Sequence, residues 1–120
     1  MILFKPEMAA AILSGQKICT RRRGRKRWNV GAIHQCYTRM PWGKEPGKPF
    51  AKVRIVSVTR EESPGSPGCG FVWPSGRKTE AEREGFASWV DFLAAYAEIN
   101  GEAALRECCW RVHFAREDDR

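Results

Sequence analysis

The sequence lacks any apolar run that approaches the roughly 20 residues needed to cross a bilayer, so it predicts no membrane-spanning helix. It also lacks a C-x-x-C pair and a secretory signal, although it contains five cysteines. These absences argue against a zinc knuckle and against a disulfide framework. We therefore expect free thiols in a reducing, cytoplasmic setting, with no metal and no organic cofactor.

No internal repeat and no Pro/Gly-rich interdomain linker divides the chain, and 120 residues suffice for one hydrophobic core. The sequence thus predicts a single domain over residues 1–120, assumed to be a monomer.

Acidic side chains are fewer than basic ones, since the chain has 14 Asp and Glu but 21 Lys and Arg, for a net charge of +7. A positive excess favours polyanionic partners, with nucleic acid ahead of an anionic membrane.

The excess is concentrated in one stretch, GQKICTRRRGRKRW, at residues 15–28. Six of the seven residues 21–27, here called the basic segment, are basic: Arg21, Arg22, Arg23, Arg25, Lys26 and Arg27. Such a run is either an exposed, solvated loop or a phosphate-binding segment. Trp28 adds a surface on which a base can stack, which favours phosphate binding. No recognition helix or zinc finger is visible, so a single strand, a loop or a lone nucleotide is the expected ligand.

The order of expected elements is strand, helix, three strands, long loop, helix, strand. A helix follows the first strand at residues 5–15 and ends at Gly15. Residues 17–22 alternate as a strand, with Thr20 and Arg22 on one face and Cys19 on the other. Two strands, at 32–40 and 48–62, flank a connecting loop at 40–49. The loop at 62–78 carries Trp73, and Trp73 or Trp28 is expected at the mouth of a cleft, where it offers a face to a base.

A second helix is predicted with Ser88 as its N-cap and Gly101 just past its end, followed by a strand at 108–117. The fold class is therefore α+β. We expect a mixed sheet that curls into a small barrel, with helices at its rim.

Three segments resemble the ASCH domain family, a branch of the PUA-like β-barrels. They are ILSGQKICTRR at 12–22, VGA at 30–32, and EREGFASWVDFLAAYAEI at 82–99 running on to CWRVHF at 109–114. The resemblance is specific at both ends of the chain and weak from about residue 37 to 78. Ile18 and Ala32 depart from the family pattern, which has a threonine and commonly a charged residue there.

The resemblance implies a pocket for RNA or a nucleoside, and one branch of the family removes the acetyl group of N4-acetylcytidine. It carries the catalytic residues of that branch onto Lys17, Thr20 and Glu84, and a following arginine onto Arg22. Independently of the family, amide hydrolysis needs a nucleophile, a proton acceptor and a group that stabilises the oxyanion. Thr20, activated by Lys17 or Glu84, and Arg22 suit these roles.

Two other functions stay open at this point. One is a non-catalytic module that binds single-stranded RNA. The other is a metal-independent ribonuclease that uses Lys17, Arg22 and His34. On the hydrolase hypothesis, alanine at Lys17, Thr20 or Glu84 is expected to lower turnover by at least about 100-fold and to leave folding intact.

Overall fold

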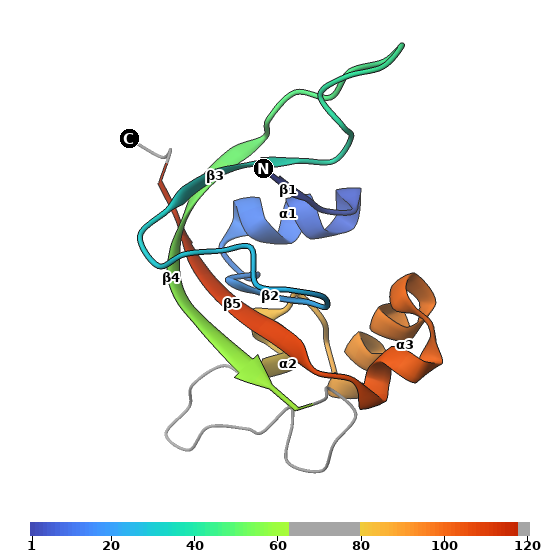
Figure 1. The fold of residues 1–120 in the computed structure, drawn as a ribbon. Coiled ribbons are helices and arrows are strands. Elements are labelled where there is room, and N and C mark those ends of the chain that lie inside the picture. The colour runs from blue at the N-terminus through green and yellow to red at the C-terminus, as the bar shows by residue number, and fades with distance from the viewer. Residues whose placement is uncertain (63–79, 118–120) are drawn as a thin grey trace.

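The computed structural model describes residues 1–62 and 80–117. Figure 1 shows a curled sheet with helices on its concave side and at one end. The elements in chain order are β1 (Ile2–Leu3), α1 (Pro6–Ser14), β2 (Cys19–Arg22), β3 (Ile33–Tyr37), β4 (Ala51–Glu61), α2 (Glu80–Arg83), α3 (Trp89–Asn100), a 3-10 helix (Glu102–Arg106) and β5 (Cys109–Arg116). This is the order predicted from the sequence, with two short helical turns added.

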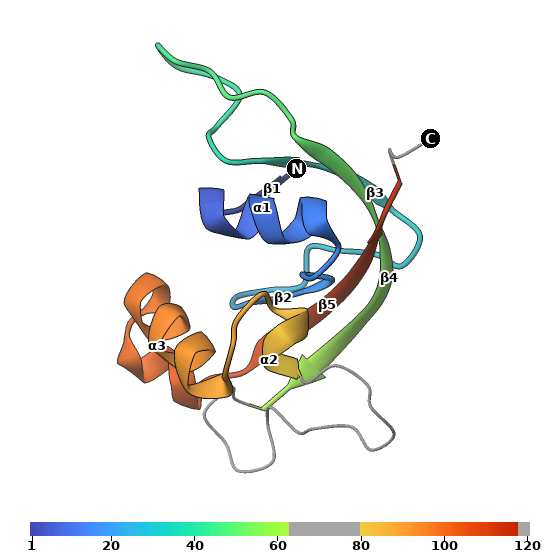
Figure 2. The same ribbon diagram turned by 180° about the vertical axis from the view of Figure 1, so that it is seen from behind.

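The five strands form one mixed sheet in the order β1-β3-β4-β5-β2. β1 pairs with β3 in parallel, and every other neighbouring pair is antiparallel. The register of β4 against β5 shifts between Ile55 and Ser57, and such a bulge increases local bend and twist. The long strands β4 and β5 curve around α1 in both views (Figures 1 and 2). The predicted α+β fold with a mixed, curled sheet is confirmed as a five-stranded half-barrel.

α1 fills the concave side because its apolar stripe includes the buried residues Ala9 and Ile12. Pro6 stands in its first turn, where its missing N–H costs no helical hydrogen bond. Gly15 ends the helix as predicted, with φ of 87° and its N–H on the Ile12 carbonyl at 3.1 Å. Ile12 belongs to the main core, together with residues from each strand except β2.

α3 builds a second, smaller core. The Ser88 hydroxyl accepts a hydrogen bond from the Asp91 N–H at 3.1 Å, which confirms the predicted N-cap. Phe92 and Tyr96 are buried, and Trp89 stacks on Phe92 at a centroid distance of 4.5 Å. These aromatic rings, with residues of β5 and the 3-10 helix, cover the end of the sheet where β2 and β5 pair.

No helix in the described part of the chain is both long enough and apolar enough to span a bilayer. Within residues 1–62 and 80–117, no group of three or more His, Cys, Asp or Glu side chains is placed to hold a metal ion.

Candidate functional site

β2 is an edge strand, and its two faces carry different chemistry. Alternation along the strand separates Cys19 and Arg21 from Thr20 and Arg22, as the sequence predicts. Thr20 is paired with Val112 of β5, which lies in the main core around α1. The opposite face of β2 meets the α2 turn and the aromatic residues of α3. One face of β2 therefore meets the core inside the half-barrel, and the other face meets the α2 turn and α3.

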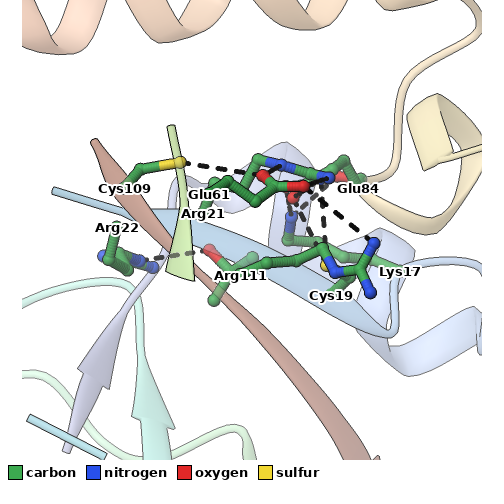
Figure 3. Close-up of polar contacts among 9 residues, drawn as sticks. Lys17, Cys19, Arg21, Arg22, Glu61, Glu84, Cys109 and Arg111 are labelled. Atoms are coloured by element: carbon green, nitrogen blue, oxygen red, sulfur yellow. Dashed lines mark hydrogen bonds and ion pairs between the residues drawn. The ribbon is translucent and has the colours of Figure 1, made fainter. Parts of the chain in front are cut away.

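Glu84 follows α2 and is the centre of the contacts on the helical face (Figure 3). Its side chain is only 2% exposed. One carboxylate oxygen accepts from the Lys17 ammonium at 3.2 Å, and the other accepts from Arg21 at 2.7 Å and from the Cys19 thiol at 3.4 Å. Lys17 also donates to the Glu84 carbonyl at 2.7 Å. The predicted proximity of Lys17 and Glu84 is thus present as a buried ion pair.

Glu61, at the end of β4, extends this network. Its carboxylate receives a two-pronged hydrogen bond from Arg21, at 2.7 Å from Nε and 3.1 Å from the terminal nitrogen. The Cys109 thiol and Arg111 also lie against Glu61, at 3.8 Å and 4.0 Å. Sequence reasoning missed Glu61 because it treated 48–62 as a strand without asking which polar side chains face Arg21. The register supplies that answer, since Glu61 pairs with Cys109 on the same side of the sheet.

The electrostatic effects on Arg21 and Arg22 are opposite. Burial alone lowers the pKa of Arg21, but its hydrogen bond to Glu61 and the negative charge of Glu84 outweigh burial and raise that pKa above the usual value. Burial lowers the pKa of Arg22, with only partial compensation from Glu84. The ring of Trp89 also lies 4.9 Å from the Arg21 guanidinium carbon. Arg21 is therefore held firmly within the folded protein.

Thr20 lies on the barrel side, 5% exposed, and its hydroxyl oxygen accepts a hydrogen bond from Arg22 Nε at 3.1 Å. Arg22 also donates to the Leu3 carbonyl at 2.7 Å and covers the ring of Phe4, 5.0 Å from its centroid. Arg22 thereby connects β2 with β1, the two edge strands of the sheet. The described hydrogen bonds of Arg22 go to uncharged oxygen atoms, in contrast to those of Arg21.

The three residues expected to be catalytic are all buried, but the described contacts join only two of them directly. Lys17 is paired with Glu84, whereas Thr20 is bound by Arg22. Phe4 links the two groups, because the Lys17 ammonium lies 5.8 Å from the ring that Arg22 also covers. The arrangement places an acid and a base in contact in one group, and a hydroxyl with a cationic donor in the other, with both groups near the Phe4 ring.

The basic segment is divided between interior and surface, which corrects the expectation that most of it meets phosphate. Arg21 is buried and Arg22 is half-buried, and both donate to oxygen atoms of the protein itself. Arg23 is exposed but donates to Glu107 and to the Asn100 carbonyl. The cations that remain at the surface of this segment are Arg25, Lys26 and Arg27.

Trp28 does not present an open face to a base, contrary to the prediction. Its side chain is 7% exposed and packs in the main core with Ile2, Phe4 and Ile12. The apolar surface of the indole is removed from water here, which stabilises the fold. Trp73, the other predicted stacking residue, lies outside the described residues.

His34, considered for a ribonuclease, lies on β3 with its Nδ1 atom 3.5 Å from the N-terminal ammonium group. Burial, and secondly that ammonium group, lower its pKa below the ordinary value.

A hollow of about 500 Å³ lies at the end of α1, where Leu13, Lys17 and Arg116 are among its lining residues. Neither feature includes Thr20.

Comparisons with known proteins agree with the geometry at the level of the fold. No family model matches the chain, and no curated protein matches it. A solved structure described as the ASCH domain from Lactobacillus crispatus JV V101 is similar to the chain, with a TM-score of 0.64 and 16% sequence identity. The match covers 96% of this chain and 78% of that one. The chain therefore has the fold of an ASCH domain, as the motifs at its two ends predict.

Proposed function

We propose that the chain is a single RNA- or nucleoside-binding domain of the ASCH type, and that it hydrolyses the acyl amide of N4-acetylcytidine-type substrates. The observation that carries this proposal is the pairing of Thr20 with the half-buried cation Arg22, near the buried Lys17–Glu84 ion pair. These are the positions to which the family resemblance assigns the reaction. The proposed chemistry requires no metal and no organic cofactor.

Thr20 is the proposed nucleophile. Its hydroxyl oxygen accepts from Arg22, so the hydroxyl proton points away from the guanidinium and toward another acceptor. A cationic donor on this oxygen stabilises the negative charge that develops as the proton leaves. Arg22 is also the proposed donor to the acyl oxygen of the substrate, because its described protein partners are neutral.

Lys17 and Glu84 are the proposed proton carriers. The Lys17 ammonium is charged while it donates to Glu84, so it first transfers a proton to the Glu84 carboxylate, 3.2 Å away. The neutral amine then accepts the Thr20 proton. The resulting alkoxide forms a bond to the acyl carbon, the bond from that carbon to N4 breaks, and Lys17 returns the proton to N4. Water hydrolyses the ester on Thr20, which releases acetate and a proton and restores the hydroxyl group, and Glu84 returns its proton to Lys17.

Thr20 offers the clearest test, because removing its hydroxyl leaves the Lys17–Glu84 ion pair intact. We expect Thr20→Val to lower deacetylation of N4-acetylcytidine at least about 100-fold, and Thr20→Ser to keep measurable activity. Cytidine release is followed by chromatography, and thermal melts confirm that each variant folds. Equal rates for the parent protein and Thr20→Val would contradict the assignment of Thr20 as nucleophile.

A second function, a module that binds single-stranded RNA without catalysis, is favoured by the exposed Arg25, Lys26 and Arg27. A free nucleoside has no phosphate for these side chains to bind. A labelled single-stranded RNA in the same assay separates the possibilities. Retained RNA without cytidine release supports the module, and shortened RNA supports a ribonuclease.

A further inference from the structure

The loop between β3 and β4, residues 38–50, projects from the sheet farther than the other described connections (Figures 1 and 2). Sequence analysis treated this region only as a connection. Its chain nevertheless follows a defined path, since Phe50 N–H donates to the Cys36 carbonyl at 2.8 Å and fixes the base of the loop. The backbone N–H of Gly47 donates to the Met40 carbonyl at 2.7 Å and holds the two arms together.

Two glycines account for this shape. A Cβ atom at Gly47 would lie 2.3 Å from the Arg39 carbonyl oxygen, so only glycine permits the two arms to approach this closely. Gly43, between the arms, has φ of 101°, in the region that favours glycine. The loop is therefore a closed projection that displays its side chains outward.

The side chains it displays combine an indole with positive charge. Trp42 is 64% exposed, which is unusual for so large an apolar side chain. Arg39, Lys44 and Lys48 are exposed in the same loop, and Glu45 is its acidic residue. The centres of protein-binding surfaces are enriched in Trp and Arg but depleted of lysine, and this loop carries two lysines. An aromatic face among cations is instead the composition of surfaces that bind single-stranded nucleic acid.

We propose that loop 38–50 is a second contact for single-stranded RNA, in which Trp42 stacks on a base and Arg39, Lys44 and Lys48 bind neighbouring phosphates. This inference rests on the proposed function, because it takes RNA to be the ligand of the domain. It extends that function by making an RNA strand, rather than a free nucleoside, the preferred ligand.

The test measures binding of a fluorescently labelled 12-nucleotide single-stranded RNA by anisotropy. Trp42→Ala should weaken binding about 5-fold or more, because one base–aromatic stack is lost, and Trp42→Phe should retain most of the affinity. The double variant Lys44→Gln with Lys48→Gln should reduce the magnitude of the log–log salt slope by about 1.4, or 0.7 for each phosphate contact. The matched control, Lys52→Gln with Arg106→Gln, removes the same charge from exposed positions outside the loop.

Deacetylation of free N4-acetylcytidine is measured on the same proteins and should be equal in parent and loop variants. Parent-like RNA affinity in Trp42→Ala and in the lysine double variant would overturn the loop assignment and leave the hydrolase proposal standing. RNA binding that weakens in the loop variants, in a protein that shows no deacetylation, supports the loop and overturns catalysis. If Trp42→Ala changes the sedimentation of the protein without changing its RNA affinity, Trp42 serves self-association and the RNA assignment is wrong.

Discussion

At the scale of single residues, Glu84 carries the negative charge that compensates the buried cations of the site. It is buried at 2% exposure and satisfies two buried cations, Lys17 and Arg21. Sequence analysis expected alanine here to spare folding, because it considered only the chemical role of the carboxylate. The structure corrects that expectation, since removal of one charge from a buried ionic group leaves its partners uncompensated.

We expect Glu84→Ala to lower the free energy of unfolding by about 3–5 kcal/mol, the usual cost of breaking a buried ion pair from one side. Urea unfolding of the parent and variant measures this difference. A loss of activity in Glu84→Ala is therefore no evidence for catalysis unless the variant is shown to be folded at the assay temperature.

The matched control is Glu107→Ala, which removes a carboxylate from an exposed ion pair with Arg23. Exposed pairs contribute at most about 1 kcal/mol, because water and salt screen them. Equal destabilisation by the two substitutions would contradict the account of Glu84 as the centre of a buried network.

Cys109 provides a prediction about pH. Burial, and then the negative charge of Glu61, raise the pKa of the Cys109 thiol to about 12, whereas an unfolded cysteine ionises near about 8.5. The folded protein therefore binds this proton more tightly than the unfolded chain does. The resulting stabilisation is complete below the unfolded pKa and decreases as pH rises toward 12.

Iodoacetamide labelling at about pH 8.5 checks this prediction, because only the thiolate reacts. We expect Cys109 to be protected in the folded protein and labelled in urea, while the neighbouring Cys108, which is exposed, is labelled in both. After proteolysis, the fragment ions in peptide mass spectrometry show whether the label is on Cys108 or on Cys109. Similar labelling rates for Cys108 and Cys109 in the folded protein would contradict a buried, neutral Cys109 thiol.

At the scale of elements, the sequence correctly predicts the features that depend on contacts between residues close together along the chain. Gly15 ends α1 and Ser88 caps α3, because each satisfies backbone groups within a few residues of itself. Alternation in 17–22 likewise separated Thr20 from Cys19. These features depend only on the spacing of residues along the chain, and this spacing can be read directly from the sequence.

Contacts between distant elements were harder to predict. Glu61 joins the site through the pairing of β4 with β5, and a bulge in β4 changes which residues share a face. Trp28 was expected at a cleft because it follows a run of basic residues, yet tertiary packing places it in the core. Trp42 was not considered, because its exposure depends on how loop 38–50 leaves the sheet. Composition identifies aromatic side chains but does not say which of them face water.

At the scale of the whole molecule, the net charge of +7 is not the charge that a ligand meets. Arg21 and Arg22 are used inside the fold, the first by carboxylates and the second by neutral oxygen atoms. The surface charge of the basic segment comes instead from Arg25, Lys26 and Arg27. Binding to a polyanion should therefore depend on these three side chains and leave the interior network unchanged.

The salt dependence of single-stranded RNA binding tests most directly the central claim that the exposed cations of the basic segment bind the phosphates of an RNA ligand. We expect the affinity of the parent protein to fall steeply with salt, and the triple variant Arg25→Gln, Lys26→Gln, Arg27→Gln to reduce the log–log slope by about 2, at 0.7 per contact. The control variant Lys52→Gln, Arg60→Gln, Arg106→Gln removes equal charge elsewhere and should keep the slope. Absence of RNA binding at low salt, or equal slopes in the parent and the basic-segment variant, would contradict the account.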